Sequence, residues 1–230
     1  MTKILLETIN LKKTFEHKNG IIKLFNNVNL KIRPGDLIAL VGPSGSGKSS
    51  FLHLLALLDD ATTGKILLNG VDTKKFNDEY KDEVRRHKIS IIFQDNNLLS
   101  DFTALENVIM PLIIRGEEKS SSIIKATKVL KDVKILNRIH HFPSELSGGE
   151  QQRVAIARTL IAETDLILAD EPTGNLDYKT SEDIFSYFKK LKKMNKAVIF
   201  ATHNRELANK ADYKLSISKG NIKRVNARPK

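Results

Sequence analysis

The segment GPSGSGKS at residues 42–49 constrains the fold of this chain more than any other feature. It follows an apolar run, Leu37–Val41, and precedes a stretch with helical character. The glycines let backbone N–H groups curve around phosphate oxygens, and the helix that follows adds the positive end of its dipole. A plain glycine-rich turn is the alternative, but the strand before it and the helix after it favour a phosphate loop. The sequence therefore predicts an α/β fold that binds a nucleotide.

The residues of this phosphate loop have distinct predicted roles. Lys48 is expected to reach the β- and γ-phosphates of ATP, and Ser49 is expected to ligate Mg²⁺. The predicted ATP-binding residues of this segment are Gly42, Pro43, Ser44, Gly45, Ser46, Gly47, Lys48, Ser49 and Ser50.

Four apolar runs are typical of buried strands in a parallel sheet, because they are continuous rather than alternating. They are Leu37–Val41, Ile89–Phe93, Leu166–Ala169 and Val198–Ala201. The first leads into the phosphate loop, and the others lead into Gln94, Asp170-Glu171 and Thr202-His203. Since open α/β sheets bind ligands at the carboxyl ends of their strands, these polar residues are predicted to surround the nucleotide.

The residues at these strand ends suit ATP hydrolysis. Asp170 is expected to hold Mg²⁺ through water, and Glu171 to polarise the attacking water as a general base. Gln94 and His203 are expected to contact the γ-phosphate or the attacking water, and Gln94 joins Ser49 and Asp170 in the predicted Mg²⁺ site. A solvated strand end for the acids, a capped strand end for Gln94 and an ordinary surface or core histidine for His203 are the structural alternatives.

A second glycine turn, LSGGE at residues 146–150, precedes another helical segment. Ser147 and Glu150 have the spacing of a capping box, which is a purely structural alternative. A cap does not require Gly148 and Gly149, however, and glycines permit close approach of a backbone to a ligand. Because the phosphate loop already saturates the phosphates of one nucleotide, this turn is predicted to bind the ATP of another subunit. Each active site would then be shared between two chains.

Helical periodicity fills much of the remaining sequence. Apolar stripes lie along Ser121–Val133, Arg153–Ala162 and Ile184–Leu191, whereas the first 35 residues alternate in short β-like pieces such as VNLKI. These patterns predict a helical insert near residues 96–160 and a small antiparallel sheet at the N-terminus.

The composition of the 230 residues limits the possible partners. Cysteine is absent, so disulfides and thiolate ligation of metals are excluded, and a reducing compartment fits. The apolar stretches FLHLLALL and VIMPLII fall short of the roughly 20 residues of a membrane span, and no signal peptide is expected. The net charge is +11, with six Lys/Arg and no acid after Asp212. Since the basic runs lack interleaved aromatic residues, solvated faces are favoured over nucleic-acid or lipid binding.

Taken together, the motifs resemble those of the ATPase subunits of ABC transporters. The resemblance rests on GPSGSGKS, Gln94, LSGGE, LILADE, the NLD turn at 175–177 and His203. It implies an α/β P-loop NTPase (ABC ATPase) core with a mostly parallel sheet, an N-terminal antiparallel β layer and an α-helical subdomain. One domain, 1–230, would comprise a nucleotide-binding core at about 1–95 and 161–230 and the helical subdomain at about 96–160.

The family also implies how the site is assembled. Its ATPase subunits form a head-to-tail homodimer, with ATP held between the phosphate loop of one chain and the signature loop of the other. The second glycine turn, Ser147–Glu150, corresponds to that signature loop. Phe15 stands at the position of the aromatic residue that stacks on adenine, although a core phenylalanine is an equally good interpretation. Asp177 matches the turn that crosses the dimer interface.

Longer segments resemble the ATPase subunit of the bacterial lipoprotein-releasing (Lol) system, among them SFLHLLALLD, NNLLSDFTALENVIMPLII and LADEPTGNLD. That system implies a peripheral ATPase at the cytoplasmic face of the inner membrane. It is bound to two integral membrane subunits, which act on lipoproteins destined for the outer membrane. The chain departs from the pattern at Phe15, Ala61, Asn96-Asn97 and Ser100, positions near the groove expected for the membrane subunits. VIMPLII either lines that groove or forms helix core.

Other ATPases with similar motifs remain as alternatives. Related ABC systems for efflux, peptide export or cell-division control share them, although a fused macrolide-type exporter would need membrane spans in the chain. DNA-associated ABC ATPases insert long coiled coils between the two glycine motifs, and this insert is short and lacks sustained heptads. Translation factors carry tandem ATPase units, whereas this sequence contains only one set of motifs. A nucleic-acid partner is therefore not expected.

Overall fold

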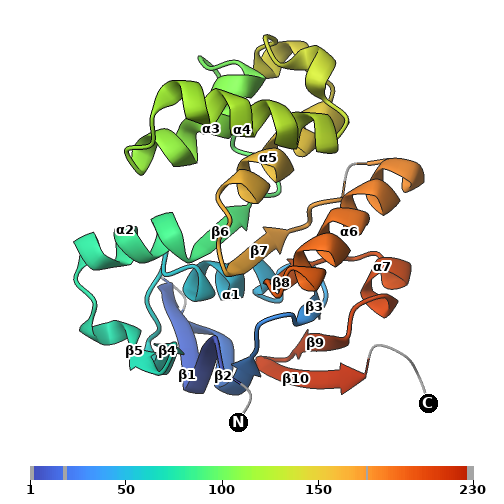
Figure 1. Cartoon of the computed structure of the whole chain (residues 1–230). Helices are drawn as coiled ribbons and strands as arrows, with labels where there is room; N and C mark the ends of the chain where they lie inside the picture. The colour runs from blue at the N-terminus through green and yellow to red at the C-terminus, as the bar shows by residue number, and fades with distance from the viewer. Residues whose placement is uncertain (1–2, 18–19, 175, 227–230) are drawn as a thin grey trace.

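The computed structural model of the chain describes residues 3–17, 20–174 and 176–226. Asn175 of the NLD turn and residues 227–230, the end of the basic tail, lie outside the described residues. Two β-sheets and a set of helices are arranged as in Figure 1. The helices are α1 (Lys48–Leu55), α2 (Asp78–His87), α3 (Ala104–Ile114), α4 (Lys119–Asp132), α5 (Gly148–Ile161), α6 (Tyr178–Lys193) and α7 (Arg205–Asn209). Three short 3₁₀ turns are Thr73–Lys75, Leu136–Arg138 and Pro143–Glu145.

A six-stranded sheet forms the centre of the molecule, with the strand order β10-β9-β3-β8-β7-β6. Its strands are β3 (Leu37–Val41), β6 (Ile89–Ile92), β7 (Leu166–Asp170), β8 (Ala197–Ala201), β9 (Tyr213–Ser218) and β10 (Asn221–Asn226). The strands from β9 to β6 run parallel, and β10 pairs antiparallel with β9 at one edge. The four strands predicted from apolar runs are confirmed, each end lying within one residue of the prediction. The sequence predicts neither β9 nor β10.

Both faces of this central sheet are buried, which explains the continuous apolar runs. On β3, Ile38 and Leu40 join a hydrophobic cluster with α1 and the N-terminal sheet. Leu37 and Ala39 join a second cluster that includes Phe185 and other residues of α6. Consequently α1, which carries Lys48 at its first position, is packed against the central sheet on the side of the N-terminal strands.

A four-stranded antiparallel sheet of order β2-β1-β4-β5 covers α1. Its strands are β1 (Leu6–His17), β2 (Gly20–Ile32), β4 (Thr63–Leu68) and β5 (Val71–Asp72). The predicted N-terminal antiparallel layer is therefore confirmed. It is completed by residues 63–72, which the sequence does not assign to this sheet.

The helices α3, α4 and α5 pack together and form the helical subdomain in the upper part of Figure 1. The predicted helix at 153–162 begins earlier, at Gly148, because its first turn is capped and solvent-facing and shows no apolar stripe. The predicted helix at 121–133 is α4, which begins at Lys119 and ends at Asp132. Since α5 also contacts β6, it connects the subdomain to the central sheet. The division of the chain near residues 96 and 160 stays a prediction.

No helix within the described ranges is both long enough and apolar enough to cross a membrane.

Candidate functional site

The phosphate loop connects β3 to α1 and owes its shape to glycine. Gly45 has a φ of +73° and Gly47, the N-cap of α1, a φ of +95°, values that L side chains rarely adopt. Gly42 is needed for close packing instead. A Cβ there would lie 2.7 Å from Ser46 Oγ and 2.8 Å from the backbone oxygen of Ile217 on β9. The loop thereby turns tightly into a helix whose first N–H groups are available to an anion.

The ammonium group of Lys48 lies inside this loop, and the residue is only 5% exposed. Its Nζ donates to the backbone oxygens of Gly42 and Pro43, both at 3.3 Å. It also lies 3.6 Å from Glu171 Oε1 and 3.2 Å from His203 Nε2. Loop carbonyls and one carboxylate hold this buried cation. When a nucleotide binds, phosphate oxygens could take the place of the carboxylate as its partners.

Glu171 and His203 meet because their strands are neighbours. Asp170, the last residue of β7, pairs with Ala201, the last residue of β8. The residues that follow therefore leave the sheet side by side, and Glu171 Oε1 lies 2.7 Å from His203 Nε2. That nitrogen can donate to Glu171 or accept from Lys48, but one tautomer cannot do both. The histidine is thus positioned between the predicted base and the lysine that is predicted to bind phosphate.

The backbone of Glu171 is left-handed, with a φ of +46°. This conformation costs roughly 1–3 kcal/mol for a residue other than glycine, and it persists where the surrounding structure enforces it. The backbone oxygen of Glu171 accepts from the N–H of Gly174 at 3.0 Å, which closes a turn directly after β7. The turn brings the carboxylate back toward Lys48 and His203, so the strained residue is the one that the sequence assigns to catalysis.

These side chains surround one cavity of about 480 Å³. The cavity is lined by Leu24, Ser44, Gly45, Gly47, Lys48, Ser49, Ser50, Gln94, Glu171 and His203. The structure thus brings Gln94, Glu171 and His203 to the exposed part of the phosphate loop, as the sequence predicts. Gly42, Pro43 and Ser46 support the loop from outside this lining. Leu24 on β2 is a wall residue that the sequence does not predict, since an apolar residue in a strand carries no signal of ligand contact.

Phe15 is a predicted ATP-binding residue that lies away from the lining of the phosphate-loop cavity. It lies on β1, is 41% exposed, and does not line the cavity formed by the described residues. The ammonium of Lys13 lies 4.6 Å from its ring centre. The alternative of a core phenylalanine is wrong, because such a residue would be buried. Stacking of this ring on adenine stays a prediction.

The predicted Mg²⁺ ligands fit a cation that arrives with the nucleotide. Asp170 is buried, and its Oδ1 has no hydrogen-bond partner among the described residues. A buried carboxylate oxygen without a partner is costly unless a cation or water satisfies it. Ser49 and Gln94 line the cavity beside it. No three His, Asp or Glu side chains cluster as metal ligands in the described part of the chain, and Mg²⁺ at phosphate sites needs only one or two protein carboxylates.

The signature loop has the capping box that its sequence predicts. Ser147 is the N-cap of α5, and its backbone N–H donates to Glu150 Oε2 at 2.8 Å. That hydrogen bond holds the pKa of Glu150 below its usual range, with smaller contributions from the Ser147 hydroxyl and Arg138. A Cβ at Gly148 would meet nothing within 4 Å. The capping box is therefore real, and the loop beside it also has open space for a ligand.

The turn that precedes α6 lies beside the signature loop. A Cβ on Gly149 would be 3.7 Å from both Leu176 and Thr180. Asp177 is the N-cap of α6 and accepts from Thr180 N at 2.9 Å, and the Thr180 hydroxyl lowers the pKa of Asp177. Neither this turn nor the signature loop contributes to the described lining of the phosphate-loop cavity in its own chain.

Arg158 is a further residue that the sequence does not predict. It lies on α5 and donates to the backbone oxygens of Asn97, at 2.9 Å, and Asn96, at 2.8 Å. Both asparagines have positive φ, and burial lowers the pKa of the guanidinium. Arg158 therefore ties the loop that follows Gln94 to the helix that follows the signature loop. Its apolar helical neighbours in the sequence gave no signal of this contact.

Comparison with known proteins agrees with these motifs. The family model described as ABC transporter matches residues 25–174. The lipoprotein-releasing system ATP-binding protein LolD of Rickettsia felis is 46% identical over 209 residues, which cover 90% of this chain and 92% of that protein. LolD of Legionella pneumophila strain Paris is 42% identical over 223 residues, which cover 96% of this chain and 98% of that protein.

Solved structures share the fold over nearly the whole chain. A dimeric post-hydrolysis state of the ATP-binding cassette MJ0796, bound to ADP and Pi, is 36% identical with a TM-score of 0.92, and the match covers 98% of this chain and 100% of that one. The cassette cbiO1 of Clostridium perfringens, at 23% identity and a TM-score of 0.84, shows the same fold. The chain therefore belongs to the ABC transporter family, as one of the ATP-binding proteins that hydrolyse ATP to drive transport.

Proposed function

We propose that this chain powers the release of lipoproteins from the inner membrane for transfer to the outer membrane. The observation that carries the proposal is the similarity to LolD proteins of several bacteria, at 41–46% identity over 90% or more of this chain. The arrangement of Lys48, Glu171 and His203 supports the hydrolytic half of this function. Bound Mg²⁺, held by Ser49, Gln94 and Asp170, would neutralise developing charge on the phosphates.

Membrane subunits are the partners that this function requires, and a groove of about 490 Å³ suits them. It lies where α2, β6, α3 and α5 meet, and its apolar surface includes Phe93, Pro111 and Ile114. Pro111 and Ile114 belong to the segment VIMPLII, for which the lining of such a groove is one of two predicted roles. An apolar helix of a membrane subunit would fill it, which would hold the chain at the cytoplasmic face of the membrane.

Two copies of this chain would form each pair of active sites. The signature loop has open space at Gly148, and in the described residues it stays outside its own chain's phosphate-loop cavity. The MJ0796 cassette with the same fold is dimeric. A head-to-tail dimer would bring the signature loop of one chain to the γ-phosphate of the ATP held by the other.

Depletion of the protein from the cells that produce it tests whether lipoproteins are the transported substrates. Outer-membrane lipoproteins should then accumulate in the inner membrane, because their release needs ATP hydrolysis by this subunit. Fractionation of the two membranes followed by immunoblotting measures the shift. Re-expression of the wild-type chain should restore sorting, and re-expression of Glu171→Gln should not. Normal sorting after verified depletion would point instead to efflux, peptide export or cell-division control.

Docking at the groove is tested separately with Ile114→Asp. Ile114 is 56% exposed, and a partner helix would bury it, so an unpaired carboxylate there should weaken copurification of the membrane subunits by about tenfold or more. The matched control is Ile124→Asp on α4, because Ile124 is 73% exposed and lies outside the groove. ATP hydrolysis by the isolated chain should be unchanged in both variants. Equal recovery of partners with both variants would place the docking surface elsewhere.

A further inference from the structure

A second cavity, unrelated to the nucleotide site, lies between α4 and α6 and has a volume of about 430 Å³. The ends of α3 and α5 complete its wall, and Val129, Leu160 and Leu191 provide apolar lining. Small-molecule sites in proteins fall in this range of volumes and combine an apolar wall with a few polar groups at fixed positions. This cavity therefore has the size and the wall of a ligand site.

The rim of the cavity is positively charged. Five cationic side chains line it, against three carboxylates. Lys125 is neutralised by Glu117 at 2.5 Å, and Lys196 by Asp165 at 3.0 Å. Two further carboxylates, Asp132 and Glu163, also line the cavity and reduce the positive potential.

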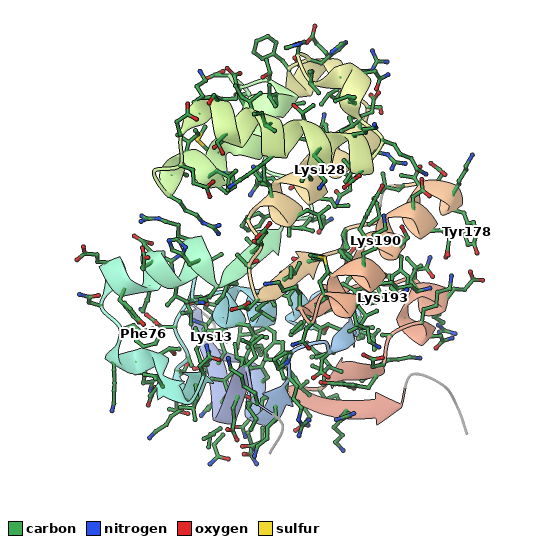
Figure 2. The ribbon with its side chains drawn as sticks, viewed as in Figure 1. Lys13, Phe76, Lys128, Tyr178, Lys190 and Lys193 are labelled. Carbon is green, nitrogen blue, oxygen red and sulfur yellow. The ribbon has the colours of Figure 1, made fainter. Side chains whose placement is uncertain are left out.

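Of the three remaining cations, Arg115 donates to backbone oxygens, and Lys128 and Lys190 face the cavity from opposite helices. Lys128 on α4 and Lys190 on α6 have no carboxylate within ion-pair distance in the described part of the chain. Lys190 instead lies 5.1 Å from the ring centre of Tyr187, which is buried below it. Figure 2 shows Lys128 and Lys190 on the same face of the molecule. An anionic group between them would gain two charge-assisted hydrogen bonds.

We propose that this cavity binds an amphiphilic anion with a single apolar chain, such as a fatty acyl carboxylate, and that binding there slows ATP hydrolysis. The apolar chain would lie against Val129, Leu160 and Leu191, with the carboxylate between Lys128 and Lys190. A cavity of about 430 Å³ suits one chain rather than the two of a membrane phospholipid. The ligand is thus a free amphiphile and not a lipid within a bilayer.

The regulatory effect follows from the elements that the ligand would join. The cavity is walled by α3 and α4 of the helical subdomain and by α6, which packs on the central sheet. Tyr187 on α6 already donates from its hydroxyl to the backbone oxygen of Asp132 on α4, at 3.1 Å. A ligand held by both helices would further restrain the subdomain that carries the signature loop. Hydrolysis should slow, because a restrained signature loop would close less readily on ATP in the shared site proposed above.

Calorimetric titration with monomeric dodecanoate tests the site. The wild-type chain should bind one dodecanoate, whereas acetate and dodecyltrimethylammonium, which lack the chain or the negative charge, should not bind. The double variant Lys128→Gln/Lys190→Gln should weaken binding by about tenfold or more, since both charged partners are lost. The matched control Lys131→Gln/Lys193→Gln removes two lysines from the same helices outside the cavity and should bind as the wild type does.

The proposal is overturned if both double variants weaken binding equally, because net charge would then explain the effect. It is also overturned if dodecanoate does not bind, or if the chain binds anionic phospholipid vesicles and ignores the monomer. The proposed slowing of hydrolysis requires dodecanoate to lower kcat at saturating ATP in the wild type and in the control double variant. Binding with unchanged kcat would overturn that part of the proposal. All these readouts use the chain alone, so they are independent of whether it serves lipoprotein release.

Discussion

Replacing Glu171 with Gln should slow ATP hydrolysis by at least about 10²-fold, the lower range for a positioned general base. The amide keeps the size of the side chain but cannot accept a proton from water. ATP binding should survive, because Lys48 and the phosphate loop are untouched. Affinity should even rise, since the carboxylate now 3.6 Å from Lys48 would no longer compete with phosphate for that cation. Steady-state phosphate release and equilibrium binding of a fluorescent ATP analogue measure the two effects.

The matched control is Glu79→Gln, which removes a solvent-exposed carboxylate of α2 that does not line the phosphate-loop cavity. It should leave turnover unchanged. If Glu171→Gln retained turnover within about tenfold of the wild type, a general base at this position would be ruled out. His203 would then be the next residue to test, since its Nε2 lies 2.7 Å from the same carboxylate.

A purified heterodimer of a Ser147→Glu chain with a Lys48→Ala chain should hydrolyse ATP in a single-turnover assay. Neither homodimer should hydrolyse ATP in the same assay. Ser147→Glu places a carboxylate where the signature loop would meet a γ-phosphate, and Lys48→Ala removes the buried cation of the phosphate loop. If each site combines loops of two chains, the heterodimer collects both lesions in one site and leaves the other intact. A burst of about one ATP per intact site is expected, against almost none for either homodimer.

The informative control is a heterodimer of the wild-type chain with a chain that carries both substitutions. Shared sites predict that this control is silent, because each of its sites contains one damaged loop. Sites built within single chains predict the reverse, with a burst in the control and none in the test heterodimer. Two affinity tags purify each heterodimer away from homodimers. A burst only in the control would refute the binding of a partner chain's ATP by the signature loop.

The sequence predicts the strand ends of the site well, because that chemistry is local. A phosphate loop has a fixed spacing between strand and helix, and apolar runs buried on both faces are easily recognised. The order in which strands pair is different, since it depends on contacts between segments far apart in the chain. Only the order β3-β8-β7-β6 explains why His203 lies between Lys48 and Glu171. No pattern near these residues contains that information.

Residues that act through backbone groups are the hardest to predict. Arg158 donates to the backbone oxygens of Asn96 and Asn97. Because every residue has a backbone carbonyl, the residue types do not indicate which carbonyl accepts such a hydrogen bond. Leu24 reaches the cavity wall because of the register of β2, which an apolar strand residue does not reveal. Of the strands that the sequence does not predict, β10 and β5 lie at sheet edges and β4 alternates only weakly, so the surrounding fold determines their conformation. β9 lies inside the central sheet, and its residues alternate between more and less buried positions, a pattern that does indicate a strand.

The left-handed backbone of Glu171 bears on how this enzyme responds to selection for thermostability. Glycine or asparagine adopts a φ of +46° more readily than glutamate does, so either substitution would relax a cost of roughly 1–3 kcal/mol. With Glu171 as the predicted general base, a screen that rewards heat resistance alone would enrich variants at position 171 that fold better and no longer turn over ATP. Gains of this kind are common where a catalytic residue is held against its own conformational preference. A stabilisation campaign should accordingly hold residue 171 fixed and search the solvent-facing positions of α2, α4 and α6 instead.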